Sequence, residues 1–89
     1  MAYSVELSAE VDRELDKLDA QHSKRILKFL RKRVAKLDDP RSIGEALHSS
    51  RLEEFWKYHV SNYQLIYKIE DDRLMVLILR IVDREEIYR

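Results

Sequence analysis

The chain has 89 residues, with one Gly, one Pro and no Cys, and 45% of its residues are hydrophobic. This length and composition predict a single folded domain, residues 1–89, with short loops and a small core. Without Cys, the chain can form neither disulfide bridges nor thiolate metal sites. Its 17 basic and 17 acidic residues cancel, so any affinity for a nucleic acid has to come from a local patch.

Charge is segregated along the chain. Residues 1–18 contain two basic and five acidic side chains, whereas residues 19–39 contain seven basic and three acidic ones. No apolar run approaches the ~20 residues that cross a bilayer, and the beginning of the chain lacks the pattern of a signal peptide. We therefore expect a cytoplasmic protein that has no membrane partner.

The beginning of the sequence predicts a strand and then a helix. In "YSVELS", residues 3–8, apolar and polar residues alternate as in a strand. Ser8 is a residue type that caps helices. Val11, Leu15 and Leu18 then follow at the spacing of one helical face, which predicts a first helix.

A second helix is predicted for residues 21–37. Its apolar stripe repeats at intervals of four, four and three residues, through Ile26, Leu30, Val34 and Leu37, and its other side is rich in Lys and Arg. The segment "LDDPRSIGEAL" ends the helix, because proline removes a backbone donor and disfavours helix at the residue before it. We expect a loop there, with room for a short turn of helix.

The second half of the sequence changes to the two-residue period of strands. Residues 55–60 and 63–69 alternate around the two-residue turn "SN". Residues 74–82 are apolar except for Arg80, as in a central strand that is covered on both faces. The order predicts an α+β domain, β-α-α-β-β-β, with a small antiparallel sheet and two helices packed on one face.

The polar face of the predicted sheet is the candidate site. Lys57 and His59 turn toward solvent in the alternation, and Arg84, Tyr88 and Arg89 would join them if the last residues fold back over the strands. Cations hold phosphates, an aromatic ring stacks on a base, and His or Lys can move a proton from the 2′-hydroxyl of RNA. Alone, Lys57, His59 and Arg84 are each more typical of a solvated surface than of a site. Tyr88 near a terminus is equally typical of a residue that covers the edge of the core.

Other chemistries lack their motifs. The chain has no phosphate-binding Gly loop, no zinc-ligand spacing and no Ser-His-Asp arrangement. We therefore expect neither a metal nor a cofactor.

Four segments together carry a family resemblance. They are "MAYSVELSAEVDRELDKLD", "LDDPRSIGEAL", the hairpin "FWKYHVSNYQLIYKIEDD" and the closing "VLILRIVDREEIYR". In order, these segments resemble the RelE toxins of bacterial type II toxin–antitoxin systems over nearly the whole chain. The most specific part of the resemblance joins the hairpin pattern W-K-Y-x-V-x-x-Y-x-L-I-Y-x-I to the ending R-E-x-I-Y-R.

The resemblance implies a RelE-like microbial ribonuclease fold and a ribosome-dependent endonuclease that cuts mRNA in the ribosomal A site. It implies three partners, namely a cognate antitoxin, the ribosome and mRNA. The site residues that it implies in this chain are the catalytic Lys57, His59, Arg84 and Tyr88 and the substrate-binding Gln64 and Arg89.

Two departures from the family pattern weaken the positive charge of this site. Gln64 stands where the family pattern Gly-Asp-Tyr-Arg has its arginine, and Asp83 and Glu85 stand at basic positions of the ending Gly-His-Arg-Arg-Glu-Val-Tyr-Arg. A preorganised cation at the reacting phosphate is worth about 3 kcal/mol, a factor of ~10² to 10³ in rate. Acids near the site would also repel phosphates. The sequence therefore predicts a family site with attenuated electrostatics.

Two binding functions remain as alternatives. The first is a ParE-like inhibitor of DNA gyrase on the same fold, which would stall DNA replication while mRNA stays intact. The second is a catalytically weak relative that mainly binds antitoxin and tunes repression of the operon, which would leave growth unaffected.

Overall fold

The computed structural model describes residues 3–47 and 55–84. The helices and strands follow in the order β1 (Ser4–Leu7), α1 (Ala9–Lys17), α2 (Ala20–Lys32), β2 (Glu45–Leu47), β3 (Phe55–Val60), β4 (Tyr63–Glu70) and β5 (Met75–Asp83). Short 3-10 turns at Val34–Lys36 and Asp71–Arg73 complete the elements. Neither α1 nor α2 is long and apolar enough to cross a membrane.

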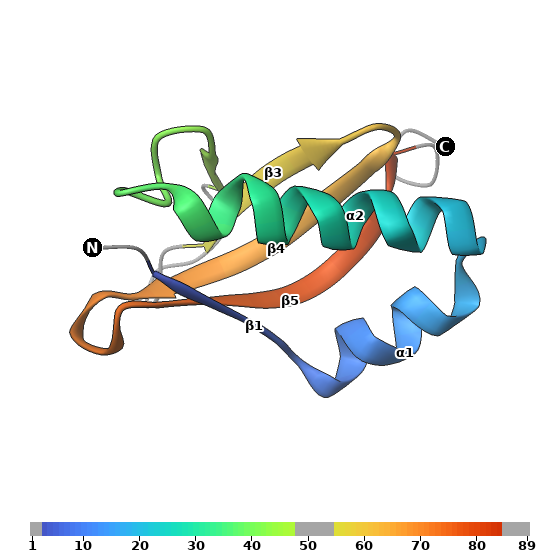
Figure 1. Ribbon diagram of the computed structural model, residues 1–89, viewed down its shortest axis with the longest axis horizontal. Coiled ribbons are helices and arrows are strands. Elements are labelled where there is room, and N and C mark those ends of the chain that lie inside the picture. Colours follow the sequence, from blue (N-terminus) through green and yellow to red (C-terminus); the bar gives the residue numbers. More distant parts are fainter. Residues whose placement is uncertain (1–2, 48–54, 85–89) are drawn as a thin grey trace.

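The five strands form one sheet in the order β1-β5-β4-β3-β2 (Figure 1). β1 runs parallel to β5, and the other neighbouring pairs are antiparallel. In Figure 1, α2 lies across the sheet, whereas α1 lies beside the second half of β5, beyond the end of β1. The predicted α+β class, with two helices packed against one sheet, is confirmed; the sheet was predicted to be antiparallel, and the parallel pairing of β1 with β5 is the one departure among the described strand pairs.

Two elements differ from the prediction. Residues 45–47 form β2, which pairs with the edge of β3, where the sequence led us to expect a loop. Three residues are too few to show a strand period, so this pairing depends on the hairpin edge already being there. The second helix ends at Lys32 rather than at residue 37, and Val34–Lys36 continue as a 3-10 turn, a common way for α-helices to end.

Polar side chains accept hydrogen bonds from backbone N–H groups at the start of α1 and at the edge of β5. As predicted, Ser8 caps α1, because its hydroxyl accepts a hydrogen bond from the Val11 amide at 3.1 Å. β1 pairs with β5 only as far as Leu7. Beyond that point the carboxylate of Glu14 on α1 accepts from the Ile81 amide of β5 at 3.3 Å. A helix side chain therefore replaces a strand partner at this edge.

The core lies between the helices and the sheet face that they cover. α1 contributes Val11 and Leu15 and α2 contributes Ile26 and Leu30, so the apolar stripes predicted from the sequence are buried. The strands contribute Tyr58, Val60, Tyr63, Leu65, Tyr67, Val76, Ile78 and Ile81. The buried residues of β3 and β4 are those that the two-residue period assigned to one face.

Two buried tyrosines connect the sheet to the loop after α2. The rings of Tyr58 and Tyr67 are stacked with centroids 4.0 Å apart. Their hydroxyls donate to the Pro40 carbonyl at 2.7 and 3.1 Å. Burial raises the pKa of both tyrosines, so they stay neutral donors at physiological pH. Gly44 passes so close that a Cβ there would collide with the Tyr67 hydroxyl.

Candidate functional site

Lys57 and His59 lie on the face of β3 that turns away from the core. Between and after them, Tyr58 and Val60 are buried, so the predicted alternation is confirmed. The Lys57 side chain is 25% exposed and the His59 side chain 37% exposed. Gln64 of β4 pairs with His59 across the hairpin. An amine, an imidazole and an amide therefore share one accessible surface.

A carboxylate from β2 lies against both basic residues. Glu45 is opposite Lys57 in the β2–β3 register. One of its oxygens, Oε2, is 3.7 Å from Lys57 Nζ and 3.9 Å from His59 Nε2. The second contact is an ion pair when the imidazole is protonated. The sequence did not single out Glu45, because its segment was expected to be a loop and "EAL" is too short to carry a strand signal.

Arg84 lies at the same end of the sheet as His59 and Gln64. Its backbone N–H donates to the Asn62 carbonyl in the β3–β4 turn at 2.8 Å. Gln64 in turn pairs with Val82 near the end of β5. Tyr88 and Arg89 lie outside the described residues, as does Glu85, so their expected roles remain predictions.

Asp83 is not on the surface that holds Lys57 and His59. It pairs with Tyr63, which is buried on the helix-covered face. With Glu14 and other residues near α1, Asp83 lines a shallow hollow on that side. The register of β5 therefore turns this side chain away from Lys57 and His59. Its expected repulsion of phosphates remains a prediction.

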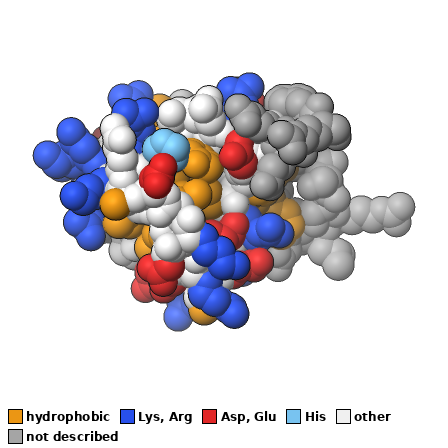
Figure 2. Space-filling view, turned by 90° about the vertical axis from the view of Figure 1, so that its right-hand side faces the viewer, with side chains coloured by type: hydrophobic (Ala, Val, Ile, Leu, Met, Phe, Trp, Pro, Cys, Tyr) orange, Lys and Arg blue, Asp and Glu red, His pale blue; other side chains and the backbone are white. Residues whose placement is uncertain are grey.

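Other basic side chains lie away from Lys57 and His59. Arg80 pairs with Ile66 in the sheet, but its Nε lies 3.6 Å from Glu10 and 3.7 Å from Glu14 of α1. In Figure 2, Lys and Arg side chains gather at the left, on the side of α2, while acidic side chains are interspersed elsewhere. The exposed basic residues of α2 are Lys24, Arg25, Lys28, Arg31 and Lys32. This outer face of α2 lies on the other side of the sheet from Lys57 and His59, and only Arg25 among these five reaches the β3–β4 turn, where it donates to the Ser61 hydroxyl at 3.2 Å.

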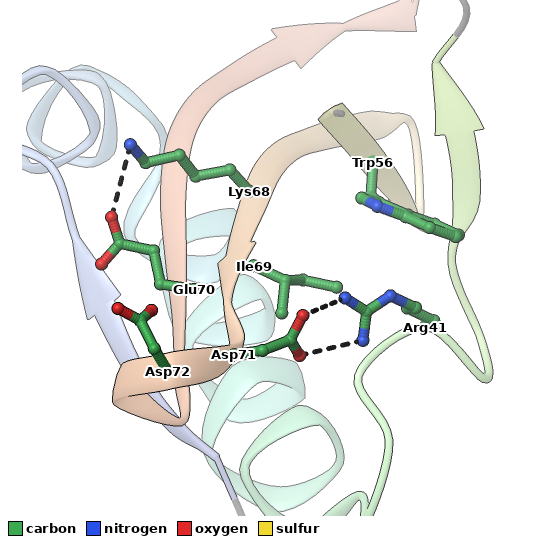
Figure 3. Close-up of a pocket in the computed structure, with 7 residues that line it drawn as sticks. All are labelled: Arg41, Trp56, Lys68, Ile69, Glu70, Asp71 and Asp72. Atoms are coloured by element: carbon green, nitrogen blue, oxygen red, sulfur yellow. Dashed lines mark hydrogen bonds and ion pairs between the residues drawn. The ribbon is translucent and has the colours of Figure 1, made fainter. Parts of the chain in front are cut away.

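A hollow of about 480 Å³ lies where β4 leads into the following turn (Figure 3). Four of its five charged groups pair with one another, since Arg41 donates to both carboxylate oxygens of Asp71 at 3.2 and 2.6 Å and Lys68 Nζ is 3.5 Å from Glu70. Hydrogen bonds from Arg41 and Tyr3 lower the pKa of Asp71. The lining residues are Arg41, Trp56, Lys68, Ile69, Glu70, Asp71 and Asp72, none of them a predicted site residue.

Metal chemistry has no candidate centre in the part of the chain that the structure describes. Across residues 3–47 and 55–84, no group of three or more His, Asp or Glu side chains is arranged to hold a metal ion. The chemistry available on the outer face of the β3–β4 hairpin is that of a cation, an imidazole and a hydrogen-bonding amide. Such groups bind an anion and move a proton.

Residues 5–88 match the family model described as the ParE toxin of the type II toxin–antitoxin system, parDE. The match covers almost the whole chain. No curated protein matches the sequence.

Solved structures of toxins share the fold. A chain of the RelBE2 toxin–antitoxin complex from Mycobacterium tuberculosis is 25% identical, with a TM-score of 0.82 over 94% of this chain and 93% of that one. A chain of the archaeal RelE–RelB complex from Pyrococcus horikoshii is 23% identical, with a TM-score of 0.74 over 94% and 97%. The isolated RelE toxin of E. coli is 20% identical, with a TM-score of 0.70 over 98% and 92%.

Proposed function

We propose that this chain, which belongs to the ParE toxin family of type II toxin–antitoxin systems within the RelE/ParE superfamily, is a ribosome-dependent endonuclease that cuts mRNA in the ribosomal A site, as its resemblance to RelE toxins implies. The observation that carries the proposal is the grouping of Lys57, His59 and Gln64 on the accessible face of the β3–β4 hairpin. Arg84 lies at the same end of the sheet. A positive, proton-transferring surface of this kind suits a phosphodiester substrate.

The proposed reaction is an in-line attack of a 2′-hydroxyl on the adjacent phosphate. The 2′-oxygen forms a bond to phosphorus, the bond from phosphorus to the 5′-oxygen breaks, and a proton passes from the first oxygen to the second through the protein. Lys57 and His59 supply the base and a phosphate contact. Arg84 stabilises the charge of the transition state, and Tyr88 stacks on a base or moves a proton. Gln64 and Arg89 hold the message beside them.

The proposed partners are a cognate antitoxin, the ribosome and its mRNA. Two of the similar solved structures are complexes of a toxin with its antitoxin. We propose that the antitoxin lays a helix on the apolar and basic surface of this chain, a common mode of recognition between proteins. Because the proposed substrate is mRNA on translating ribosomes, the proposed location is the cytoplasm.

Primer extension on a reporter mRNA in a bacterial translation extract tests the endonuclease. We expect cuts at positions set by the codons, only when ribosomes are present, and stronger cutting by Gln64→Arg because a charged donor replaces a neutral one. If Gln64→Arg alone cuts, the site of the unmodified protein is attenuated. If neither protein cuts, the endonuclease proposal fails.

Inhibition of DNA gyrase is the second candidate function, because the matching family model is itself that of a ParE toxin. A supercoiling assay with purified gyrase and a relaxed plasmid separates the two. We expect no inhibition of supercoiling at concentrations that cut mRNA in the extract. Inhibition of gyrase while mRNA stays intact would replace the endonuclease with the gyrase function.

A further inference from the structure

We propose that Glu45 is an internal counter-anion of the candidate site. Its carboxylate lies where an RNA phosphate would bind, and it sets how tightly the site holds RNA. The inference rests on the proposed function, since it assumes that Lys57 and His59 receive a phosphate. It adds a residue on β2 that neither the sequence motifs nor the family comparison single out.

The geometry of the contact is that of an anion shared by two basic groups. A single oxygen of Glu45 lies 3.7 Å from Lys57 Nζ and 3.9 Å from His59 Nε2. The two basic residues are two positions apart on β3, so their side chains emerge on the same face. A phosphate oxygen that contacted both residues would need the volume in which the carboxylate now lies. RNA and Glu45 therefore compete for the same pair of side chains.

The carboxylate is held in place by its backbone and not by its own burial. The Glu45 side chain is 64% exposed, and both distances exceed those of a charge-assisted hydrogen bond. Exposed ion pairs of this kind are weak. β2 itself is fixed, because Ala46 pairs with Trp56 in the sheet. A phosphate can displace the side chain, but the negative charge stays nearby and opposes binding.

The other strand cations carry acidic partners that do not reach the candidate site. Lys68 on β4 pairs with Glu70 on the same strand, at 3.5 Å. Arg80 on β5 pairs with acids of α1. Glu45 differs because it comes from a separate strand and contacts two predicted site residues at once. Removing its charge therefore changes the site itself, whereas removing an acid elsewhere changes only the net charge.

Binding of a fluorescently labelled single-stranded RNA oligonucleotide, followed by anisotropy, tests the proposal. We expect Glu45→Gln to lower the Kd about three- to tenfold at low salt, with a smaller gain at high salt. The matched control is Asp72→Asn, which changes the net charge equally but lies in the exposed turn between β4 and β5. We expect less than about a twofold change for the control, because the Coulomb energy falls with distance and this turn follows the far end of β4 from Gln64.

A double variant identifies the group through which Glu45 acts. In a Lys57→Ala background, Glu45→Gln should raise the affinity for RNA much less than it does in the unmodified protein, because the lysine that the substitution frees is no longer there. Circular dichroism of each variant verifies that the fold is retained. Equal affinity for the unmodified protein, Glu45→Gln and Asp72→Asn overturns the inference. A full gain that persists without Lys57 overturns it as well.

The same variants in the translation extract distinguish this inference from the proposed function. If Glu45→Gln binds RNA more tightly but no variant cuts mRNA, the role of Glu45 stands and the endonuclease fails. If the protein cuts mRNA and Glu45→Gln binds no better than the control, the endonuclease stands and the role of Glu45 fails.

Discussion

On one face of β3, Tyr58 and Val60 are buried, and the Tyr58 hydroxyl donates to a backbone carbonyl at 2.7 Å. On the other face, Lys57 and His59 are partly exposed and contact the carboxylate of Glu45 at 3.7 and 3.9 Å. The first face is stabilised by buried area and satisfied hydrogen bonds, the second by weak ion pairs. Substitutions on the two faces should therefore separate stability from function.

The largest expected effect is the loss of a buried ring. Tyr67→Ala removes the ring stacked on Tyr58 and should lower the free energy of unfolding by about 3–5 kcal/mol. Lys57→Ala on the outer face should change it by less than about 1 kcal/mol. Urea denaturation followed by circular dichroism compares the two. If the two variants lost equal free energy of unfolding, the buried face would not contribute more to stability than the outer face, and the prediction would be wrong.

Activity should respond in the opposite way. Lys57→Ala and His59→Ala should each lower the rate of mRNA cleavage about 10²-fold or more, because each removes a group placed at the reacting phosphate. Lys68→Ala is the matched control, since Lys68 is a strand cation paired with Glu70 outside the candidate site. Cleavage rates in the translation extract give the comparison. A similar loss for all three variants would place the site elsewhere.

Gly44 tests how closely the buried face is packed. Gly44→Ala should lower the free energy of unfolding by about 1–3 kcal/mol, because the new Cβ would meet the Tyr67 hydroxyl. In a Tyr67→Phe background the cost should fall, because the hydroxyl is gone. Denaturant unfolding of the two single variants and the double variant measures this coupling. Independent, additive losses would show that Gly44 is constrained by something other than Tyr67.

The smallest expected effect concerns an exposed carboxylate. Hydrogen bonds from Arg41 and Tyr3 hold the pKa of Asp71 below its usual value. The stability that Asp71 contributes is therefore present above its unfolded pKa of about 4 and is lost as the pH falls below it. Asp71→Asn should flatten the acid side of the stability profile slightly. Thermal unfolding between about pH 2 and pH 6 measures the effect, and an unchanged profile would contradict it.

The outer face of β3 was predictable because alternation is local. The two-residue period of residues 55–69 placed Lys57 and His59 on one face and Tyr58 on the other, and the structure agrees. The position of Asp83 was not predictable in the same way. Its face depends on where β5 pairs with β4, and the register shift between Ile66 and Tyr67 lies within that pairing.

By itself the sequence determined the helix cap at Ser8, the apolar stripes of the two helices and the two faces of the hairpin. These features depend on residues close together in the chain, whose spacing and chemistry suffice. Only the tertiary structure decided that "EAL" becomes β2 and that Glu45 reaches Lys57 and His59. That contact joins segments separated in sequence, and it exists because strand pairing brings their side chains to one surface.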